Sequence, residues 1–359
     1  MEKKLSYEKL EQRIKELETE AAHHKRVWPA FNGYIIGTGS SVPKRVLANE
    51  YFEHIVATSD EWITQRTGIK ERHIASTENR ETTTDLAIQA SLKAVEMAGI
   101  RPNDLDMIVV GTVTQDRLFP STACMVQKAL HAENAVSFDI SAGCAGFLYS
   151  LDTVNKAIRC GSCKNALIVG VERPSTVLDW SERGTCVLMG DGAGAVVLTA
   201  SEKQDVVFSS QLKSNGNFGD LLYSSHGNSY LPKDIKDIDL KPFQIKMEGA
   251  QLFKQATRCL SSIAKDVLQR NSLSIEDIAL LIPHQANIRI IKTVAKNLNI
   301  PMDKVYANID RYGNTSSASI PIAIDEANRR GLLKKDTYIL FASFGSGLTW
   351  GASLIKWLI

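Results

Sequence analysis

Two hydrophobic patterns alternate along most of the chain. Short apolar, β-branched runs predict strands, and apolar residues spaced three and four positions apart predict helices. In the first half the predicted strands are 34–36, 107–111, 136–140, 166–171 and 194–198, and the predicted helices are 83–98, 121–131 and 145–158. This alternation indicates an α/β fold with buried sheets.

A second round of the same pattern follows. Its predicted strands are 206–212, 280–282, 305–308, 338–343 and 350–357, and its predicted helices are 250–269, 288–297 and 317–330. Both rounds close with a glycine-rich segment that leads into a last strand, at 190–198 and at 345–357. These matching ends predict a duplicated unit, with one half at 31–205 and the other at 206–359.

Residues 1–30 differ from the rest of the chain. Apolar residues recur at three- and four-residue spacing, with Lys and Glu between them, at Tyr7, Leu10, Ile14, Leu17 and Ala21. The spacing predicts an amphipathic helical extension at the N-terminus. Two interpretations stay open: a solvated helix that packs on the body or frays, and a helix for self-association or docking.

Composition limits the function classes. The chain has 359 residues, 44% of them hydrophobic, and a net charge of +2, so bulk nucleic-acid binding is not expected. It has no apolar run long enough to span a membrane, and its N-terminus lacks the apolar core of a signal peptide. Six cysteines in a chain of this length do not form the pattern of a disulfide framework. We therefore expect a cytoplasmic protein.

One cysteine occupies a position suited to chemistry. Cys144 follows the predicted strand 136–140 through small residues, and the predicted helix begins directly after it. Unpaired backbone N–H groups and the positive end of a helix dipole meet at such a place, which favours the thiolate and lowers the thiol pKa. A buried structural cysteine is the alternative for this segment alone.

Three further motifs follow in order. His284 stands in the sequence HQAN, Asn314 in GNTSSAS, and the chain closes with FGSGLTWG at 344–351. A cysteine with a distant histidine and asparagine is the pattern expected of a cysteine nucleophile. With SAGCAG around Cys144, these motifs resemble the β-ketoacyl-acyl-carrier-protein synthase III family over about 32–359. The resemblance implies a thiolase-like, duplicated α-β-α-β-α layered fold and a homodimer.

The resemblance also implies an activity, which is the decarboxylative condensation of an acyl-CoA starter with malonyl-acyl carrier protein. Cys144 would carry the acyl group, and His284 and Asn314 would hydrogen-bond the malonyl thioester carbonyl. The backbone amides of Cys144 and Ser346 would form the oxyanion hole, although the family often has glycine at the position of Ser346. It implies no metal and no cofactor besides these substrates. The alternatives are a related acyltransferase or condensing enzyme of secondary metabolism, and a catalytically silent scaffold or binding protein.

Five more residues match positions that bind the substrates in the family. Trp62 and Arg183 would clamp the adenine of coenzyme A, because an indole face and a guanidinium plane can stack on either side of a base. Arg66 would bind its phosphates and Asn287 its pantetheine arm. Phe119 resembles the residue that crosses the dimer interface to close the acyl pocket. Core packing is the alternative for Trp62.

Basic residues share one face of the predicted helix 288–297. Arg289, Lys292 and Lys296 are spaced three and four apart, and Lys254 on another helix resembles a further member of the patch. Acyl carrier protein is acidic, so this patch would attract it. An ordinary solvated helix face is the alternative.

A C-x-x-C motif at Cys160 and Cys163 has other readings. The functional interpretations of this motif are a redox pair and half of a zinc site. There is no second C-x-x-C, and the motif follows a predicted helix rather than opening one. We therefore expect the end of a helix, and no metal site.

Overall fold

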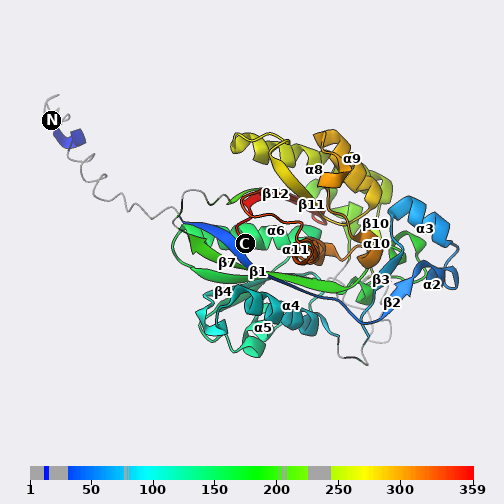
Figure 1. The fold of residues 1–359 in the computed structure, drawn as a ribbon. Coiled ribbons are helices and arrows are strands. Elements are labelled where there is room, and N and C mark those ends of the chain that lie inside the picture. The colour runs from blue at the N-terminus through cyan, green and yellow to red at the C-terminus, as the bar shows by residue number, and fades with distance from the viewer. Residues whose placement is uncertain are drawn as a thin grey trace, which may run out of the picture.

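The computed structural model describes residues 12–15, 31–76, 79, 81–201, 203, 206, 208–224 and 244–359. The described part of the chain forms five layers, with two mixed sheets separated and covered by helices (Figure 1). The predicted N-terminal helix lies outside the described residues, except that residues 12–15 are helical.

The first sheet contains five strands in the order β1-β7-β6-β4-β5. Their bounds are β1 Asn32–Ser41, β4 Met107–Gly111, β5 Val136–Ile140, β6 Asn165–Glu172 and β7 Gly192–Ser201. Strand β4 pairs in parallel with β5 and β6, whereas β7 is antiparallel to both β1 and β6. Strand β5 stands at one edge of this sheet.

The second sheet contains four strands in the order β11-β12-β13-β8. Their bounds are β8 Phe208–Ser214, β11 Ile278–Pro283, β12 Tyr338–Gly345 and β13 Thr349–Lys356. Strands β11 and β12 are parallel, and β13 is antiparallel to β12 and β8. The two sheets repeat one plan, which is parallel strands followed by an antiparallel return.

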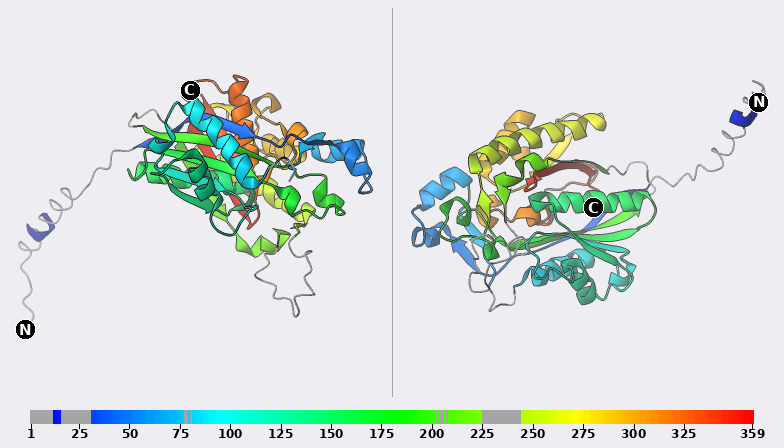
Figure 2. Two further views of the ribbon diagram at one scale, coloured as in Figure 1. Left: turned by 90° about the horizontal axis from the view of Figure 1, so that it is seen from below. Right: turned by 180° about the vertical axis from the view of Figure 1, so that it is seen from behind.

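Three helical layers complete the fold. Helices α4 (Thr83–Ala98) and α5 (Thr122–Leu130) cover the outer face of the first sheet, and α8 (Gly249–Arg270) and α9 (Ile288–Leu298) cover the outer face of the second (Figures 1 and 2). Helices α6 (Gly146–Arg159) and α11 (Ser319–Arg329) lie between the sheets. The α-β-α-β-α arrangement expected from the resemblance is therefore confirmed.

Short elements gather beside these layers. They are β2 Val46–Ala48, α2 Asn49–Glu53, α3 Asp60–Thr67, β3 Glu71–His73, α7 Arg183–Cys186, β9 Leu222–Tyr223, β10 Lys246–Met247 and α10 Ile309–Tyr312. Two single 3₁₀ turns, η2 (Gly143–Ala145) and η9 (Ser316–Ala318), precede the two central helices. The turns η2 and η9 contact each other, η2 also contacts β12 of the second sheet, and η9 contacts β6 of the first sheet. Both turns therefore lie where the two halves of the chain meet.

Local sequence explains the helix bounds well. Helix α4 begins after Thr82, whose hydroxyl accepts the Asp85 N–H while the Asp85 carboxylate accepts the Thr82 N–H, a capping box. It ends at Gly99, which adopts a left-handed conformation that glycine tolerates. Helix α6 buries residues on most of its surface, including Phe147 and Leu151, because both sheets pack against it.

One predicted strand is wrong. Residues 305–308 make only an isolated bridge, between Val305 and Leu281. The side chain of Gln285 satisfies the backbone beyond it, since its amide donates to the Tyr306 carbonyl and its oxygen accepts the Asn308 N–H. A buried side chain thus takes the place of a fifth strand in the second sheet.

Candidate active site

Cys144 lies in the turn η2 between β5 and α6, as the strand–turn–helix pattern predicted. Gly143 has a φ of +52°, and a Cβ there would come within 2.3 Å of the Ser346 hydroxyl oxygen. Glycine is required at this position by both conformation and space. The turn therefore presents Cys144 at the start of a buried helix.

The closing glycine-rich loop packs directly on this turn. The hydroxyl of Ser343 donates to the Cys144 carbonyl over 2.7 Å, and that of Thr349 donates to the Ala142 carbonyl over 2.7 Å. A Cβ at position 143 would lie 2.8 Å from the Ser346 backbone nitrogen. The backbones of Cys144 and Ser346, the two positions predicted to form an oxyanion hole, therefore lie close to each other.

His284 follows β11 and is buried, with 4% of its surface exposed. Its Nδ1 lies 2.7 Å from the Ser319 hydroxyl, which also accepts the Gln285 N–H. A serine that accepts in this way can donate its own proton to Nδ1, which leaves Nε2 as the protonated nitrogen. Burial lowers the pKa of His284 to about 4, so the ring is neutral at pH 7.

Asn314 precedes η9, and two hydrogen bonds fix its position, one through its backbone N–H and one through its side-chain oxygen. Its N–H donates to the Leu188 carbonyl, and its side-chain oxygen accepts the Ser316 N–H over 2.9 Å. Cys144, His284 and Asn314 line one cavity of about 150 Å³, together with Asn287 and Phe253. The structure thus brings together three residues that are up to 170 positions apart in the sequence.

The predicted effect of the helix on Cys144 is wrong. Burial, together with the nearby Glu172 carboxylate, raises the pKa of the Cys144 thiol to about 11, although a hydrogen bond from Ser316 lowers it. Removal from water is thus the largest influence on the protonation of this thiol. Cys144 is therefore a neutral thiol at pH 7.

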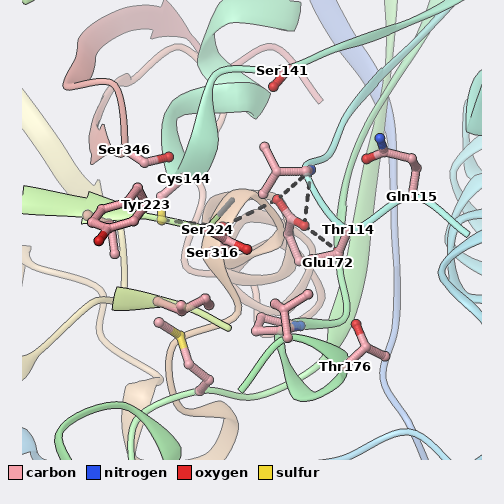
Figure 3. Close-up of a pocket in the computed structure, with 16 residues that line it drawn as sticks. Thr114, Gln115, Ser141, Cys144, Glu172, Thr176, Tyr223, Ser224, Ser316 and Ser346 are labelled. Carbon is pink, nitrogen blue, oxygen red and sulfur yellow. Dashed lines mark hydrogen bonds between the residues drawn. The ribbon is translucent and has the colours of Figure 1, made fainter. Parts of the chain in front are cut away.

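A second cavity of about 490 Å³ meets the first at Cys144, Met189 and Leu222. Glu172, at the end of β6, lies on its wall near Cys144, with Ser316 between the two (Figure 3). Thr114 and Tyr223 also line this cavity. Sequence analysis did not single out Glu172, because a charge at the end of an apolar run carries no signal by itself.

Comparison with known proteins identifies the family. Residues 138–216 match the family described as 3-oxoacyl-[acyl-carrier-protein (ACP)] synthase III, and residues 268–357 match its C-terminal region. The β-ketoacyl-[acyl-carrier-protein] synthase III of Caldanaerobacter subterraneus is 49% identical over 323 residues, which are 90% of this chain and 97% of that protein. The chain belongs to the β-ketoacyl-[acyl-carrier-protein] synthase III family.

Solved structures agree with this assignment. The crystal structure of the synthase III from Aquifex aeolicus has a TM-score of 0.84 and 46% identity, with 90% of this chain and 100% of that one covered. The priming β-ketosynthase of the R1128 polyketide pathway has a TM-score of 0.85 and 31% identity, over 91% of this chain and 96% of that one. This chain is thus closer in sequence to the synthase III proteins of Caldanaerobacter subterraneus and Aquifex aeolicus than to this polyketide enzyme.

The residues that the synthase III resemblance assigns to coenzyme A form two groups. The Arg183 guanidinium lies 4.6 Å from the centre of the Trp62 ring, and that of Arg66 lies 5.9 Å from the same ring. Asn287 lines the smaller cavity and caps α9, since its side-chain oxygen accepts the Arg289 N–H. Trp62 is partly buried on its apolar neighbours, so core packing and a stacking face are both present in one side chain.

Phe119 lines neither of the two cavities that meet at Cys144. It is 82% exposed, on the segment between β4 and α5, and the adjacent Leu118 is 56% exposed. In this synthase III chain a large apolar side chain is thus presented to the surroundings.

Lys254, Arg289, Lys292 and Lys296 are exposed on α8 and α9. Arg289 lies 5.7 Å from the ring of Phe253, so its helix and that of Lys254 meet at the small cavity.

The C-x-x-C motif ends α6, as predicted, with Cys160 exposed at the helix end and Cys163 buried. In the described part of the chain, no group of three or more His, Cys, Asp or Glu side chains could hold a metal ion. None of its helices is long and apolar enough to cross a membrane.

Proposed function

We propose that this chain condenses an acyl-CoA starter with malonyl-acyl carrier protein and so initiates fatty acid synthesis. The observation that carries the proposal is the convergence of Cys144, His284 and Asn314 on one cavity in a member of the synthase III family. Cys144 attacks the acyl-CoA thioester, and coenzyme A leaves as its thiol. Malonyl-acyl carrier protein then loses carbon dioxide, and the resulting carbanion attacks the acyl group on Cys144.

The oxyanion of each addition step needs two donors. The backbone N–H groups of Cys144 and Ser346 fill this role, supported by the backbone contact between the two loops. An amide donor is retained whether residue 346 is serine or glycine. Removing one such donor typically costs about 2.7–4 kcal/mol of transition-state stabilisation.

His284 and Asn314 stabilise the enolate that forms on decarboxylation. A neutral imidazole with its proton on Nε2 donates a hydrogen bond without taking a proton from the intermediate. The side-chain nitrogen of Asn314 is a second donor that does not titrate, because its oxygen already accepts the Ser316 N–H. Both residues therefore act on malonyl thioester rather than on the first acyl transfer.

The two cavities that meet at Cys144 suit the two parts of the substrate. The larger one, with Val113, Val177 and Ile245 on its wall, takes the acyl chain. The smaller one leads past Asn287 and Phe253 toward Arg289, so it takes the pantetheine arm. Trp62, Arg183 and Arg66 bind the nucleotide end of coenzyme A, and Arg183 must shift if a base is to stack on Trp62.

The exposed cations Lys254, Arg289, Lys292 and Lys296 attract acyl carrier protein to the mouth of the smaller cavity.

The working form is a homodimer. Among the described residues, strand β5 is an edge strand whose first residue, Val136, is 62% exposed, and Phe119 is 82% exposed on the connection between β4 and α5. Edges and apolar side chains of this kind are usually covered. A cytoplasmic setting agrees with six free cysteines, one of them a nucleophile.

Intact-mass spectrometry with acyl-CoA tests the proposal. The parent chain should gain one acyl group, and Cys144→Ala should gain none, because no other thiol has the same two donors beside it. Cys160→Ala, which removes an exposed thiol at the end of α6, is the matched control and should be acylated like the parent. An adduct of undiminished yield on Cys144→Ala would overturn the assignment.

A further inference from the structure

The structure holds a buried carboxyl group that the three-residue mechanism does not use. Glu172 is fully buried, and burial raises its pKa to about 7 despite hydrogen bonds from Thr114, Val113, Ser317 and Ser316. Within the described residues it has hydrogen-bond donors around it and forms no ion pair. A buried carboxylate without a cation lowers stability, so its presence beside the nucleophile calls for a function.

Ser316 connects this carboxyl group to the nucleophile. Its hydroxyl oxygen lies 3.3 Å from the Cys144 sulfur and 3.3 Å from the Glu172 Oε1 (Figure 3). Ser316 has a φ of +50°, which is unfavourable for a residue with a side chain. Glycine would adopt this conformation more easily, but it has no hydroxyl. Serine, despite the strain, places a hydroxyl between the Cys144 sulfur and the Glu172 carboxyl group.

The other donors leave one place on Glu172 for this serine. Thr114 donates to the Oε2 oxygen over 2.5 Å, and the Val113 N–H lies 3.2 Å from both oxygens. The Thr112 hydroxyl lies 3.4 Å from Oε2. The Ser317 hydroxyl lies 3.2 Å from Oε1, but its hydrogen bond to the Gly111 carbonyl is shorter, at 2.8 Å. The single proton of Ser316 is thus the one that can pass between Oε1 and the sulfur.

We propose that Glu172, acting through Ser316, takes the proton of Cys144 before acyl transfer. The thiol proton moves to the Ser316 oxygen, while the Ser316 proton moves to Glu172, and a thiolate and a carboxylic acid result. After the thiolate has displaced coenzyme A, the departing sulfur takes a proton from Ser316, which regains its own from Glu172. The buried site carries one negative charge before and after the transfer. This role rests on the proposed function, in which Cys144 is the acylated residue.

His284 is a poor alternative base. It is neutral, its Nδ1 is bound to Ser319, and it has no hydrogen bond to Cys144 among the described residues. Other charged groups near Glu172 have their own partners. They are Arg173 and Asp116, which face each other at 4.0 Å, and Asp139 and Asp191, which accept backbone N–H groups.

The pH dependence of the rate of Cys144 acylation by acyl-CoA tests the relay, in a Cys160→Ala background and followed by intact mass. Because ionised Glu172 is the base in this step, the parent rate should rise with its ionisation near pH 7 and then level off. Glu172→Gln should lose the rise near pH 7. Ser316→Ala keeps the carboxyl group but breaks the path, and should lose it too. Acylation at pH 7.5 should slow on the order of 100-fold in both.

Thr114→Val provides the matched control. It removes the shortest hydrogen bond to Glu172 and should shift the rise to higher pH without abolishing it. Thr114→Ser, which keeps the hydroxyl, should leave the rise in place. A rise near pH 7 that persists in folded Glu172→Gln or Ser316→Ala would overturn the relay. Because both variants keep Cys144, an acyl group gained on it at any rate would leave the acyl-CoA test of Cys144 unaffected.

Discussion

Gly345 and Cys144 are in direct backbone contact: a Cβ at position 345 would lie 2.4 Å from the Cys144 backbone nitrogen. Gly345 ends β12 of the second sheet, and Cys144 lies in the turn η2 between β5 of the first sheet and α6. A strand of the second sheet therefore positions the turn that carries Cys144. Any side chain at 345 must displace the turn that carries Cys144.

Gly345→Ala should therefore damage catalysis more than folding. The added methyl pushes the Cys144 N–H away from the oxyanion hole, and loss of one such donor lowers kcat about 10²–10³-fold. Steady-state condensation assays and thermal unfolding measure the two effects. Gly216→Ala is the control, because a Cβ there meets no atom within 4 Å. Equal rates for the two variants would contradict this view of the contact.

Much of this arrangement could be predicted from the sequence. Periodic segments such as 83–98 and 107–111 have the predicted bounds, because apolar spacing and caps are local signals. The strand predicted at 305–308 was wrong, because the side chain of Gln285, which is 21 and 23 positions from the residues it binds, makes hydrogen bonds to this backbone in place of a neighbouring strand. The predicted direction of the Cys144 pKa shift was also wrong, because the burial of the thiol and the approach of Glu172 arise from tertiary packing. Glu172 becomes a candidate functional residue only through its hydrogen bond from Ser316, which is 144 positions away in the sequence.

His284→Ala and Asn314→Ala should separate the two half-reactions. Both donors act on the malonyl thioester, so decarboxylation should be lost while Cys144 still accepts an acyl group, at least slowly. Decarboxylation of malonyl thioester and intact-mass acylation are measured in parallel. Ser319→Ala, which removes only the partner of His284 Nδ1, should cause a smaller loss of decarboxylation. Parent-like decarboxylation in both Ala variants would show that these roles are wrong.

Lys296→Glu should weaken use of malonyl-acyl carrier protein and spare acylation by small acyl-CoA. Lys296 is exposed two turns along α9 from Arg289, so its reversal acts on docking without disturbing His284. The parent kcat/KM for the carrier should also fall as salt rises, because charges at a rim act mainly on association. Lys335→Glu, before the opposite end of β12 from Gly345, is the matched charge control. Equal losses with both substrates would indicate a damaged site, and no loss would return these lysines to an ordinary solvated surface.

Removal of residues 1–26 should leave a folded, dimeric and active chain. The first strand of the sheet begins at Asn32, and the dimer surface proposed here lies on β5 and at Phe119. Light scattering and condensation assays compare the shortened chain with the parent. Val136→Lys in the full chain places a charge on the β5 edge and should weaken the dimer instead. A monomeric shortened chain would assign the N-terminal segment to the assembly.

Glu172→Gln should change how stability depends on pH. The folded pKa of Glu172, about 7, lies above the ordinary carboxyl value of 4.5. Between these values the folded parent keeps a proton that the unfolded chain releases, so its free energy of unfolding falls as pH rises. A carboxamide does not titrate, so the variant lacks this fall and should gain on the parent by about 1.4 kcal/mol per pH unit.

Urea unfolding of both proteins at pH 4.5, 6 and 7.5, at one fixed protein concentration, measures this difference. The gain of the variant over the parent should reach roughly 3 kcal/mol across the window, whatever constant offset the lost hydrogen bonds introduce. His284 and the other carboxyl groups titrate in both proteins, so their contributions cancel in the comparison. A difference that stays constant from pH 4.5 to 7.5 would mean that the folded pKa of Glu172 is not raised above the ordinary carboxyl value, and Glu172 would then be too weak a base to take the Cys144 proton near neutral pH.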